Sequence, residues 1–395
     1  MVWEKVKLGD VCTKIGSGAT PKGGSTVYVD KGVSFIRSQN VYNLYFDYDG
    51  LVYINDEAAK KLSGVTIKNN DVLLNITGDS VARTCLVPSE LIPARVNQHV
   101  AIVRPDCNIL NPIFLNYYLA SPFMQAFMLG LAVGKGASRN AMTKEMIANF
   151  EIPCPPINIQ KRIIDILKPY DDLIENNQKQ IKLLEEAAQR LYKEWFVDFR
   201  FPGYESTEFV DGLPKGWKKV KLIDLADVQY GYAFDGSLFN SDKRGTPIVR
   251  IRNIPNGTTE DYTTEEAPLQ YTVSNGDIVV GMDGEFHINS WCGSTSYLVQ
   301  RTCKFTPKNE TMKGWLLQAI YEPIKFFEKT VVGATVSHLG KKHIDTIELL
   351  TGSEELYKPF NDFLKKRQLL RNQNIVLSEA RDRLLPKLMS GEIEV

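Results

Sequence analysis

Histidine and cysteine are scarce in this 395-residue chain, which has four of the former and six of the latter. The cysteines stand apart at positions 12, 85, 107, 154, 292 and 303, with no Cys-x-x-Cys pair and no histidine cluster beside them. This scatter argues against a zinc site and favours reduced, mostly buried thiols in a cytoplasmic protein. We therefore expect no metal site in this chain.

Long apolar runs and an excess of charge are also missing. No stretch approaches the ~18 apolar residues that span a bilayer, and the start of the chain has no signal-peptide core. The 47 Lys and Arg residues balance 47 Asp and Glu residues. Zero net charge does not forbid DNA binding, because the field depends on local clustering. It indicates that affinity is not purely electrostatic, or that a basic partner helps.

Familiar catalytic motifs are absent as well. There is no Gly-x-Ser-x-Gly, no His-Glu-x-x-His and no acidic nuclease cluster. Asn111-Pro-Ile-Phe114 is similar to the Asn-Pro-Pro-Tyr/Phe of adenine methyltransferases, but the second proline is missing and Asn-Pro is a common helix start. Asp71 and Asp277 each precede an apolar strand, which favours a turn-forming role over catalysis.

What the chain does contain is a tandem duplication. Trp3-Glu-Lys-Val-Lys-Leu8 recurs as Trp217-Lys-Lys-Val-Lys-Leu222, and further matches follow in unchanged order. These include Asn70-Asp-Val-Leu-Leu74 with Gly276-Asp-Ile-Val-Val280, and Phe35-Ile-Arg37 with Ile248-Val-Arg250. A repeat of about half the chain predicts two similar domains rather than a solenoid.

Each copy is predicted to be an α+β domain. In the first copy, residues 72–76 and 96–103 are typical of strands, and residues 112–120 form a helical stretch that Pro122 interrupts. Residues 313–329 repeat the helical stretch, with Pro323 at the matching place. We expect these two domains at 1–152 and 201–352, separated and followed by helical segments at 153–200 and 353–395.

The helical segments carry a heptad pattern. Residues 159–195 contain no glycine and one proline, Pro169, where we expect a kink or a join. Apolar residues recur there at 4-3-4-3 spacing, which is typical of a coiled-coil seam. The second segment repeats the seam less regularly, with Arg367 and Arg381 intruding, and Pro386 is expected to end or bend it.

A lone helix with such a seam needs a partner, and the simplest partner for each helix is the other. We predict an antiparallel coiled coil with pseudo-two-fold symmetry, whose register is set by two asparagines. A hairpin that only stabilises the chain is the alternative. The seam positions selected for the interface are Ile174, Asn177, Ile181, Leu184, Leu191, Leu370, Asn374, Leu377 and Leu384.

Polar loops between the strands are the remaining candidates for function. They carry Arg, Asn and Gln, which make bidentate contacts with guanine and adenine edges, and glycines with hydroxyls and cations, which suit phosphates. Arg37 and Arg250 could equally be structural salt-bridge partners. The candidate DNA contacts are Ser17, Thr20, Lys22, Arg37, Gln39, Asn40, Lys135, Ser138, Arg139, Tyr232, Arg250, Arg252, Asn253, Thr335, Ser337 and His338.

The whole chain resembles the specificity (S) subunits of type I restriction–modification systems. The resemblance is carried by Asn97-Gln-His-Val-Ala-Ile-Val-Arg-Pro105 and by the helix-end motifs Leu191-Tyr-Lys-Glu-Trp-Phe-Val-Asp-Phe199 and Leu384-Leu-Pro-Lys-Leu-Met-Ser-Gly-Glu392. Gly276 keeps a glycine of the family where the first copy has Asn70. The second domain departs from the Asn-Gln-His-Val motif, with Val299-Gln-Arg-Thr-Cys303 in its place.

The resemblance implies a non-catalytic subunit that binds a split, asymmetric site in double-stranded DNA, one half per domain. It implies docking of two methylase subunits that carry S-adenosylmethionine, and of two restriction subunits, carrying ATP and magnesium, where the complex also cleaves. No cofactor is expected in this chain. A coiled-coil scaffold that binds only proteins and a self-sufficient DNA methyltransferase are the competing hypotheses.

Overall fold

The computed structural model describes residues 3–132, 141–330 and 338–395. It divides into two compact units. Unit 1 comprises residues 1–173 and 377–395, and unit 2 comprises residues 174–376. Each unit therefore contains one globular part and one end of each long helix, whereas the boundaries predicted from the sequence set the helices apart.

The sheets of unit 1 form two layers. An antiparallel sheet has the order β2 (Cys12–Ser17), β11 (Val100–Pro105), β8 (Val72–Asn75), β9 (Thr84–Leu86). The second has the order β10 (Ala94–Val96), β4 (Val33–Ile36), β7 (Val52–Ile54), β3 (Tyr28–Val29), with β10 and β4 parallel. Two small pairs complete the unit: β1 (Lys5–Lys7) with β12 (Glu151–Pro153), and β5 (Val41–Tyr42) with β6 (Tyr45–Phe46).

Unit 2 repeats this topology. Its antiparallel sheet has the order β16 (Ala226–Tyr230), β24 (Thr302–Pro307), β21 (Ile278–Gly281), β22 (Ile288–Ser290). Its second sheet has the order β17 (Phe239–Asn240), β19 (Tyr262–Thr263), β18 (Thr246–Val249), β23 (Ser296–Leu298), β20 (Thr272–Val273), again with one parallel pair, β18 and β23. The pairs β13 (Phe209–Val210) with β14 (Leu213–Pro214) and β15 (Lys218–Lys221) with β25 (Glu348–Thr351) lie outside these sheets. The predicted duplication is confirmed.

The central strands are apolar on both faces because each face meets a different layer. Val72 and Leu74 of β8 belong to the core under the helices, whereas Leu73 belongs to the core between the two sheets. Ile278 and Val280 alternate with Val279 in the same way in unit 2. Side chains of a strand point alternately to its two faces, so a strand covered on both sides reads as a continuous apolar run.

Short helices cover the first sheet of each unit. In unit 1 these are α2 (Pro112–Ala120), α3 (Pro122–Ala132) and α4 (Lys144–Ala148), with α1 (Asp56–Lys61) against the second sheet. In unit 2 they are α6 (Leu222–Leu225), α7 (Lys313–Ala319), α8 (Tyr321–Thr330) and α9 (Lys341–Ile344). Asn111 caps α2 by accepting a hydrogen bond from the backbone of Ile113 at 2.9 Å, so its motif starts a helix.

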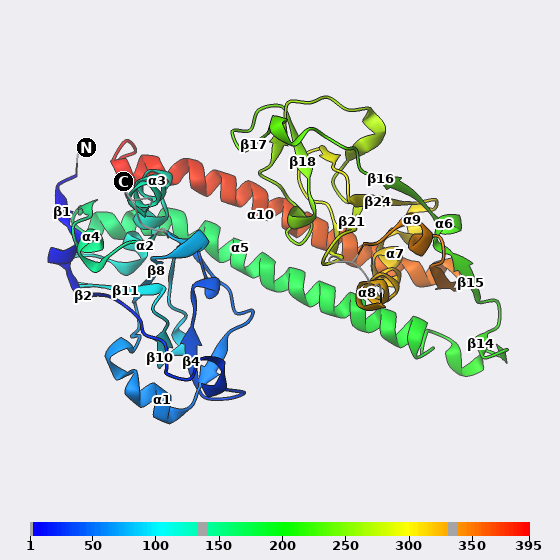
Figure 1. The fold of residues 1–395 in the computed structure, drawn as a ribbon, viewed down its shortest axis with the longest axis horizontal. Helices are drawn as coiled ribbons and strands as arrows, with labels where there is room; N and C mark the ends of the chain where they lie inside the picture. Colours follow the sequence, from blue (N-terminus) through cyan, green and yellow to red (C-terminus); the bar gives the residue numbers. More distant parts are fainter. Residues whose placement is uncertain (1–2, 133–140, 331–337) are drawn as a thin grey trace. The chain divides into compact units, whose positions relative to one another are not determined.

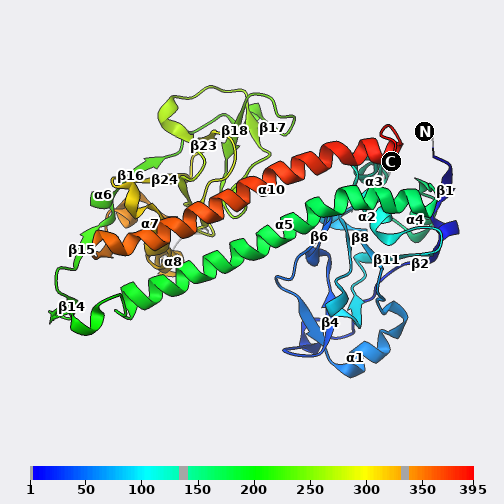
Figure 2. The same ribbon diagram turned by 180° about the vertical axis from the view of Figure 1, so that it is seen from behind.

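The long helices are α5 (Ile157–Tyr192) and α10 (Lys358–Ser390), green and orange-red in Figure 1. Within each unit their segments run antiparallel, as Figure 2 also shows. Both helices continue through Pro169 and Pro386, so neither proline marks a join or ends its helix. Ile163 and Leu167 pack with Leu388 in the core of unit 1, so the first turns of α5 and the last of α10 complete that domain.

Local turn chemistry explains two further features. Asn70 and Gly276 precede β8 and β21 with φ of 68° and 88°, a left-handed conformation that glycine and asparagine tolerate best. The following aspartates each accept a backbone hydrogen bond three residues back, Asp71 from Lys68 at 2.7 Å and Asp277 from Ser274 at 2.9 Å. The turn-forming role predicted for both aspartates agrees with this geometry.

One predicted strand is confirmed only in part, since residues 100–103 belong to β11. Residues 96–103 are not continuous, because Asn97, Gln98 and His99 form a turn between β10 and β11. No helix within the described ranges is long and apolar enough to cross a bilayer, and the same ranges hold no group of three or more His, Cys, Asp or Glu placed to bind a metal.

Candidate DNA interface

A 3₁₀ turn follows the first strand of each parallel pair. In unit 1 it is η3 (Ser38–Asn40) after β4, and in unit 2 it is η10 (Ile251–Asn253) after β18. Each turn is closed by its asparagine, because Asn40 accepts a hydrogen bond from the Arg37 backbone at 3.0 Å and Asn253 accepts one from Arg250 at 2.8 Å. The same local structure is therefore built twice.

These contacts correct the assignment of Asn40. Its side chain is fully buried, and its amide donates to the carbonyls of Asp47 and Asp49 at 2.9 and 3.2 Å. A side chain with no exposed surface cannot touch DNA, so Asn40 holds the turn instead. Asn253 is only half-buried, but its amide is likewise engaged, donating to Asp261 at 3.1 Å.

The side chains of Arg37 and Arg250 also contact other residues of their own units. The Arg37 guanidinium lies 5.9 Å from the ring centre of Tyr28 and donates to the Gly50 carbonyl at 2.5 Å. The Arg250 guanidinium lies 5.5 Å from the ring centre of Phe239. Both side chains are half-buried. These contacts indicate a structural role for both arginines, through rings and a backbone carbonyl and not through the salt bridges that the sequence suggested.

The exposed side chains of the two turns are different. Gln39 in η3 is exposed and makes no hydrogen bond with any described residue. Arg252 in η10 is exposed and forms a two-bond ion pair with Asp261. Burial opposes ionisation of Asp261, but hydrogen bonds from Arg252 and Asn253 outweigh it and hold the pKa of this carboxyl below its usual value.

Each turn is braced from a neighbouring strand, by different residues. In unit 1, Asn75 at the end of β8 is fully buried and donates to the Ser38 carbonyl at 2.8 Å. In unit 2 the matching position is Gly281, where an added Cβ would lie 3.1 Å from Ile251. Asn289 of β22 braces this turn instead, donating to the carbonyls of Ile254 and Pro255 at 2.9 and 2.7 Å.

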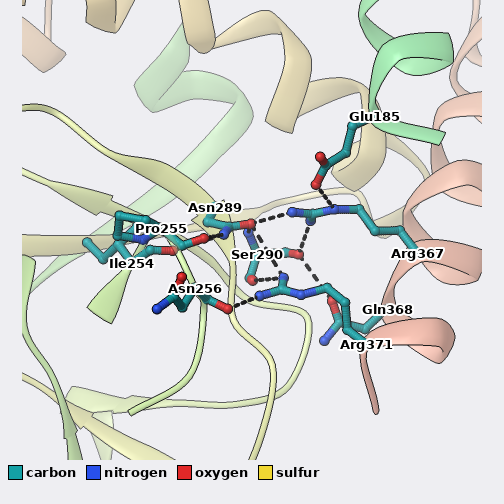
Figure 3. A network of polar contacts seen from close by, with 9 residues as sticks. All are labelled: Glu185, Ile254, Pro255, Asn256, Asn289, Ser290, Arg367, Gln368 and Arg371. Carbon is teal, nitrogen blue, oxygen red and sulfur yellow. Dashed lines mark hydrogen bonds and ion pairs between the residues drawn. The ribbon is translucent and has the colours of Figure 1, made fainter. Parts of the chain in front are cut away.

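Two arginines extend this bracing to α10 (Figure 3). Arg367 donates to Asn289 Oδ1 at 2.6 Å, to Ser290 Oγ at 2.7 Å and to Glu185 of α5 at 2.6 Å. Arg371 donates to the carbonyls of Ser290, at 2.8 Å, and Asn256. Burial lowers the pKa of Arg371 to about 10. The turn that carries Arg252 is thus connected to both long helices by partly buried polar contacts within unit 2.

A polar cluster lies just past the end of β8 in unit 1, and another lies just past the end of β21 in unit 2. In unit 1, Thr77 bonds His99 at 2.6 Å, and Thr20 donates to Gln98. In unit 2, Asp283 pairs with Arg301 at 2.8 Å and with His338 at 2.5 Å. Three predicted residues of unit 1 are exposed: Ser17 at the end of β2, Thr20 in the cluster of that unit, and Lys22 in the loop after β2. In unit 2, His338 is exposed in the cluster with Asp283.

Some of these groups were missed by reasoning from the sequence. Asp283 and Arg301 stand where the first copy has Thr77 and His99, and none of these four residues was among the candidate contacts. An exposed tyrosine, Tyr42, lies two residues after η3, with the guanidinium of Arg83 4.5 Å from its ring centre. Aromatic rings and arginine guanidinium planes are the groups on which nucleic-acid bases stack.

The other predicted contacts divide into two groups. Tyr232 is half-buried, with ring centres of Phe234 and Tyr271 4.8 and 5.1 Å away, so packing accounts for much of its surface. Lys135, Ser138, Arg139, Thr335 and Ser337 lie outside the described residues.

The asparagines predicted to set the helix register meet within unit 2. Asn177 is buried and donates to Asn374 Oδ1 at 2.9 Å. One heptad either side on α10, Arg367 pairs with Glu185, and Arg381 pairs with Asp171 at 2.6 Å in unit 1. Leu370 is also buried; half-buried seam residues are Ile174, Ile181, Leu184, Leu191, Leu377 and Leu384.

Comparison with known families decides what the duplicated domain is. The family profile described as type I restriction modification DNA specificity domain matches residues 2–186 and 214–351. The chain belongs to this family. The two matched segments include both turns and both polar clusters, so each copy of the predicted recognition domain corresponds to one match of the specificity domain.

Relatives over the full length are also specificity subunits. The chain is 24% identical to the type I restriction enzyme MjaIX specificity subunit of Methanocaldococcus jannaschii, covering 100% of this chain and 94% of the relative. It is 24% identical to the HindI specificity subunit of Haemophilus influenzae, covering 99% of each. The crystal structure of a type I S subunit from M. genitalium shares the fold, with a TM-score of 0.55 at 14% identity over 98% of this chain and 96% of that one.

Proposed function

We propose that this specificity subunit reads a split, asymmetric DNA target with one half per unit. The observation that carries the proposal is the duplicated turn, which presents Gln39 in unit 1 and Arg252 in unit 2 from the same backbone structure. A repeated scaffold with different exposed groups suits two surfaces that read different sequences.

The chain's partners are proposed to be two methylase subunits, joined by two restriction subunits where the complex also cleaves. S-adenosylmethionine, ATP and magnesium would be bound by those partners, and this chain would be non-catalytic. Methylation requires the target adenine to leave the duplex, so bent or opened DNA is expected. The equal numbers of basic and acidic residues, 47 each, support a sharing of the phosphate contacts with partner subunits.

Mapping of methylated adenines tests this proposal. Genomic DNA would be methylated by the chain together with its methylase subunits and sequenced to locate the modified bases. The expected result is one motif with two specified halves and an unread gap. Replacing residues 214–351 with the matching segment of another family member should change one half only. A single continuous motif, or a change in both halves, would refute the proposal.

The two competing classes give different outcomes in simpler assays. A self-sufficient methyltransferase would methylate DNA as the purified chain with S-adenosylmethionine. A protein-only scaffold would leave target DNA unshifted in a mobility assay even with the methylase subunits present. We expect neither result.

A further inference from the structure

Gln39 and Arg252 occupy the same place in the two copies. Each is the residue before the asparagine that closes the turn, and each is the exposed polar side chain of that turn. The two side chains differ in hydrogen-bonding chemistry. Arginine offers parallel donors that match O6 and N7 of guanine, whereas glutamine offers one donor and one acceptor that match N7 and N6 of adenine.

The ion pair of Arg252 orients its guanidinium. Nε donates to Asp261 Oδ2 at 3.1 Å, and Nη2 donates to Asp261 Oδ1. A guanidinium has five N–H groups in a fixed plane, so this pair uses one edge and leaves both N–H groups of Nη1 and one of Nη2. The remaining edge holds two parallel donors with a carboxylate behind them. Arg252 is thus pre-oriented, which lowers the entropy lost on forming a bidentate contact.

Gln39 is placed without a comparable partner. No described residue bonds its amide, so both the donor and the acceptor stay available. Gly50 lies under it with φ of 66°, and a Cβ at that position would come within 2.5 Å of Gln39 Nε2. The glycine therefore gives the amide room beside the turn that Asn40 and Asn75 hold in place.

We propose that Arg252 reads a guanine in the half-site of unit 2 and that Gln39 reads an adenine in the half-site of unit 1. This inference rests on the proposed function, and it adds the chemical identity of one base in each half. Phosphate binding is the competing role for Arg252. If Arg252 binds a phosphate, replacing it with alanine would weaken binding to all sequences equally and reduce the salt dependence of binding. If Arg252 reads a base, the same replacement would change the base preference at one position.

The experiment uses the chain assembled with its methylase subunits and a library of targets randomised one position at a time. Arg252→Ala should lose about 5- to 150-fold of discrimination at one guanine position of one half, the range for a bidentate base contact. Gln39→Ala should do the same at one adenine position of the other half. Arg252→Lys separates the two roles, because lysine keeps the charge but not the paired donors.

A matched control is available in the same unit. Arg244 has a side chain 69% exposed, against 62% for Arg252, and it also pairs with an aspartate, Asp242 at 3.5 Å, but it lies outside the turn. Arg244→Ala should leave base preference unchanged.

Equal weakening on every sequence after Arg252→Ala, with Arg252→Lys restoring binding, would overturn the inference in favour of a phosphate contact. Unchanged preference in both alanine variants would also overturn it while leaving the proposed function intact. If the unsubstituted complex has no split target, the proposed function fails and this inference fails with it.

Discussion

Arg367→Met tests whether the long helices position the reading turn of unit 2. The arginine side chain is 11% exposed and forms charge-assisted bonds with Glu185, Ser290 and Asn289. Through Asn289, these bonds reach the carbonyls of Ile254 and Pro255 directly after the turn. Methionine has an unbranched apolar side chain about as long as the aliphatic part of arginine, and it removes all three bonds.

The expected loss of stability depends on which hydrogen bonds the former partners of Arg367 keep after the substitution. Removing one partner of a buried ion pair costs about 3–5 kcal/mol, but the Glu185 side chain is 41% exposed and can be rehydrated. Ser290 still donates to Gln368, and Asn289 Oδ1 still accepts from the Ser290 backbone. No buried polar atom is left alone, so we expect a cost of about 2–3 kcal/mol. For a domain of this size that lowers the melting temperature by roughly 4–12 °C.

The functional effect should be confined to one half of the target. Residues 251–257 lose one of their two links to α10, because Arg371 still donates to the Asn256 carbonyl. Their amide hydrogen exchange should therefore accelerate, and binding to the unit 2 half-site should weaken. The control is Arg381→Met on the same helix. Arg381 pairs with Asp171, which also accepts a hydrogen bond from Tyr117 of α2, all within unit 1. That variant should weaken the other half-site.

Binding would be measured with targets in which either half is scrambled, using the complex with methylase subunits. The reasoning is refuted if both variants weaken the same half-site. Unchanged hydrogen exchange at 251–257 in Arg367→Met, despite a lower melting temperature, would also contradict it.

Three further predictions concern the helices and the turns. Asn374→Leu should destabilise unit 2 by about 1–3 kcal/mol, because buried Asn177 keeps only a long hydrogen bond to Gln373, at 3.5 Å. The double change of both asparagines to leucine should be near neutral; calorimetry of the four-variant cycle checks this, and additive effects would contradict it. Asp71→Ala should cost about 3–5 kcal/mol by leaving Arg104, paired at 2.6 Å, without its carboxylate, and Asp277→Ala should cost less because its ion pairs are longer, at 3.4 and 3.8 Å; equal losses in urea unfolding would be inconsistent with that ranking. Inserting one heptad at 173/174 and at 376/377 adds about 10 Å of helix. If the lengths of α5 and α10 set the spacing of the two half-sites, the gap in the methylated motif should become roughly three base pairs longer, and an unchanged gap would exclude this spacing role.

Patterns carried by neighbouring residues predicted most of the fold. The helix at residues 112–120 and the strand at 72–76 were recognisable because burial of one or two faces leaves a period in the sequence. The duplication supplied the architecture. The strand predicted at 96–103 is correct for residues 100–103, but the sequence pattern did not reveal the turn at residues 97–99 that separates β10 from β11.

The candidate site was harder to predict because the sequence gives the type of each polar side chain but not its hydrogen-bond partners. Asn40 and Gln39 are equally plausible base readers in the sequence, yet one is buried by contacts with residues 47 and 49 and the other is exposed. Arg367 and Arg381 looked like defects in an apolar seam. Their partners, Glu185 and Asp171, lie about 180 to 210 residues away in the chain and are identified only by the packed helices.

Unit 1 is built from two segments far apart in the chain, and this affects how it folds during synthesis. Its core includes Leu385, Leu388 and Met389, which leave the ribosome after all of unit 2. While the second domain is synthesised and folds, the core around Ile163 and Leu167 therefore lacks the side chains that α10 contributes to it. A premature stop near residue 376 would damage the domain translated first and spare the one translated last. Loss of the chain's final segment should thus abolish the half of the target assigned to its beginning.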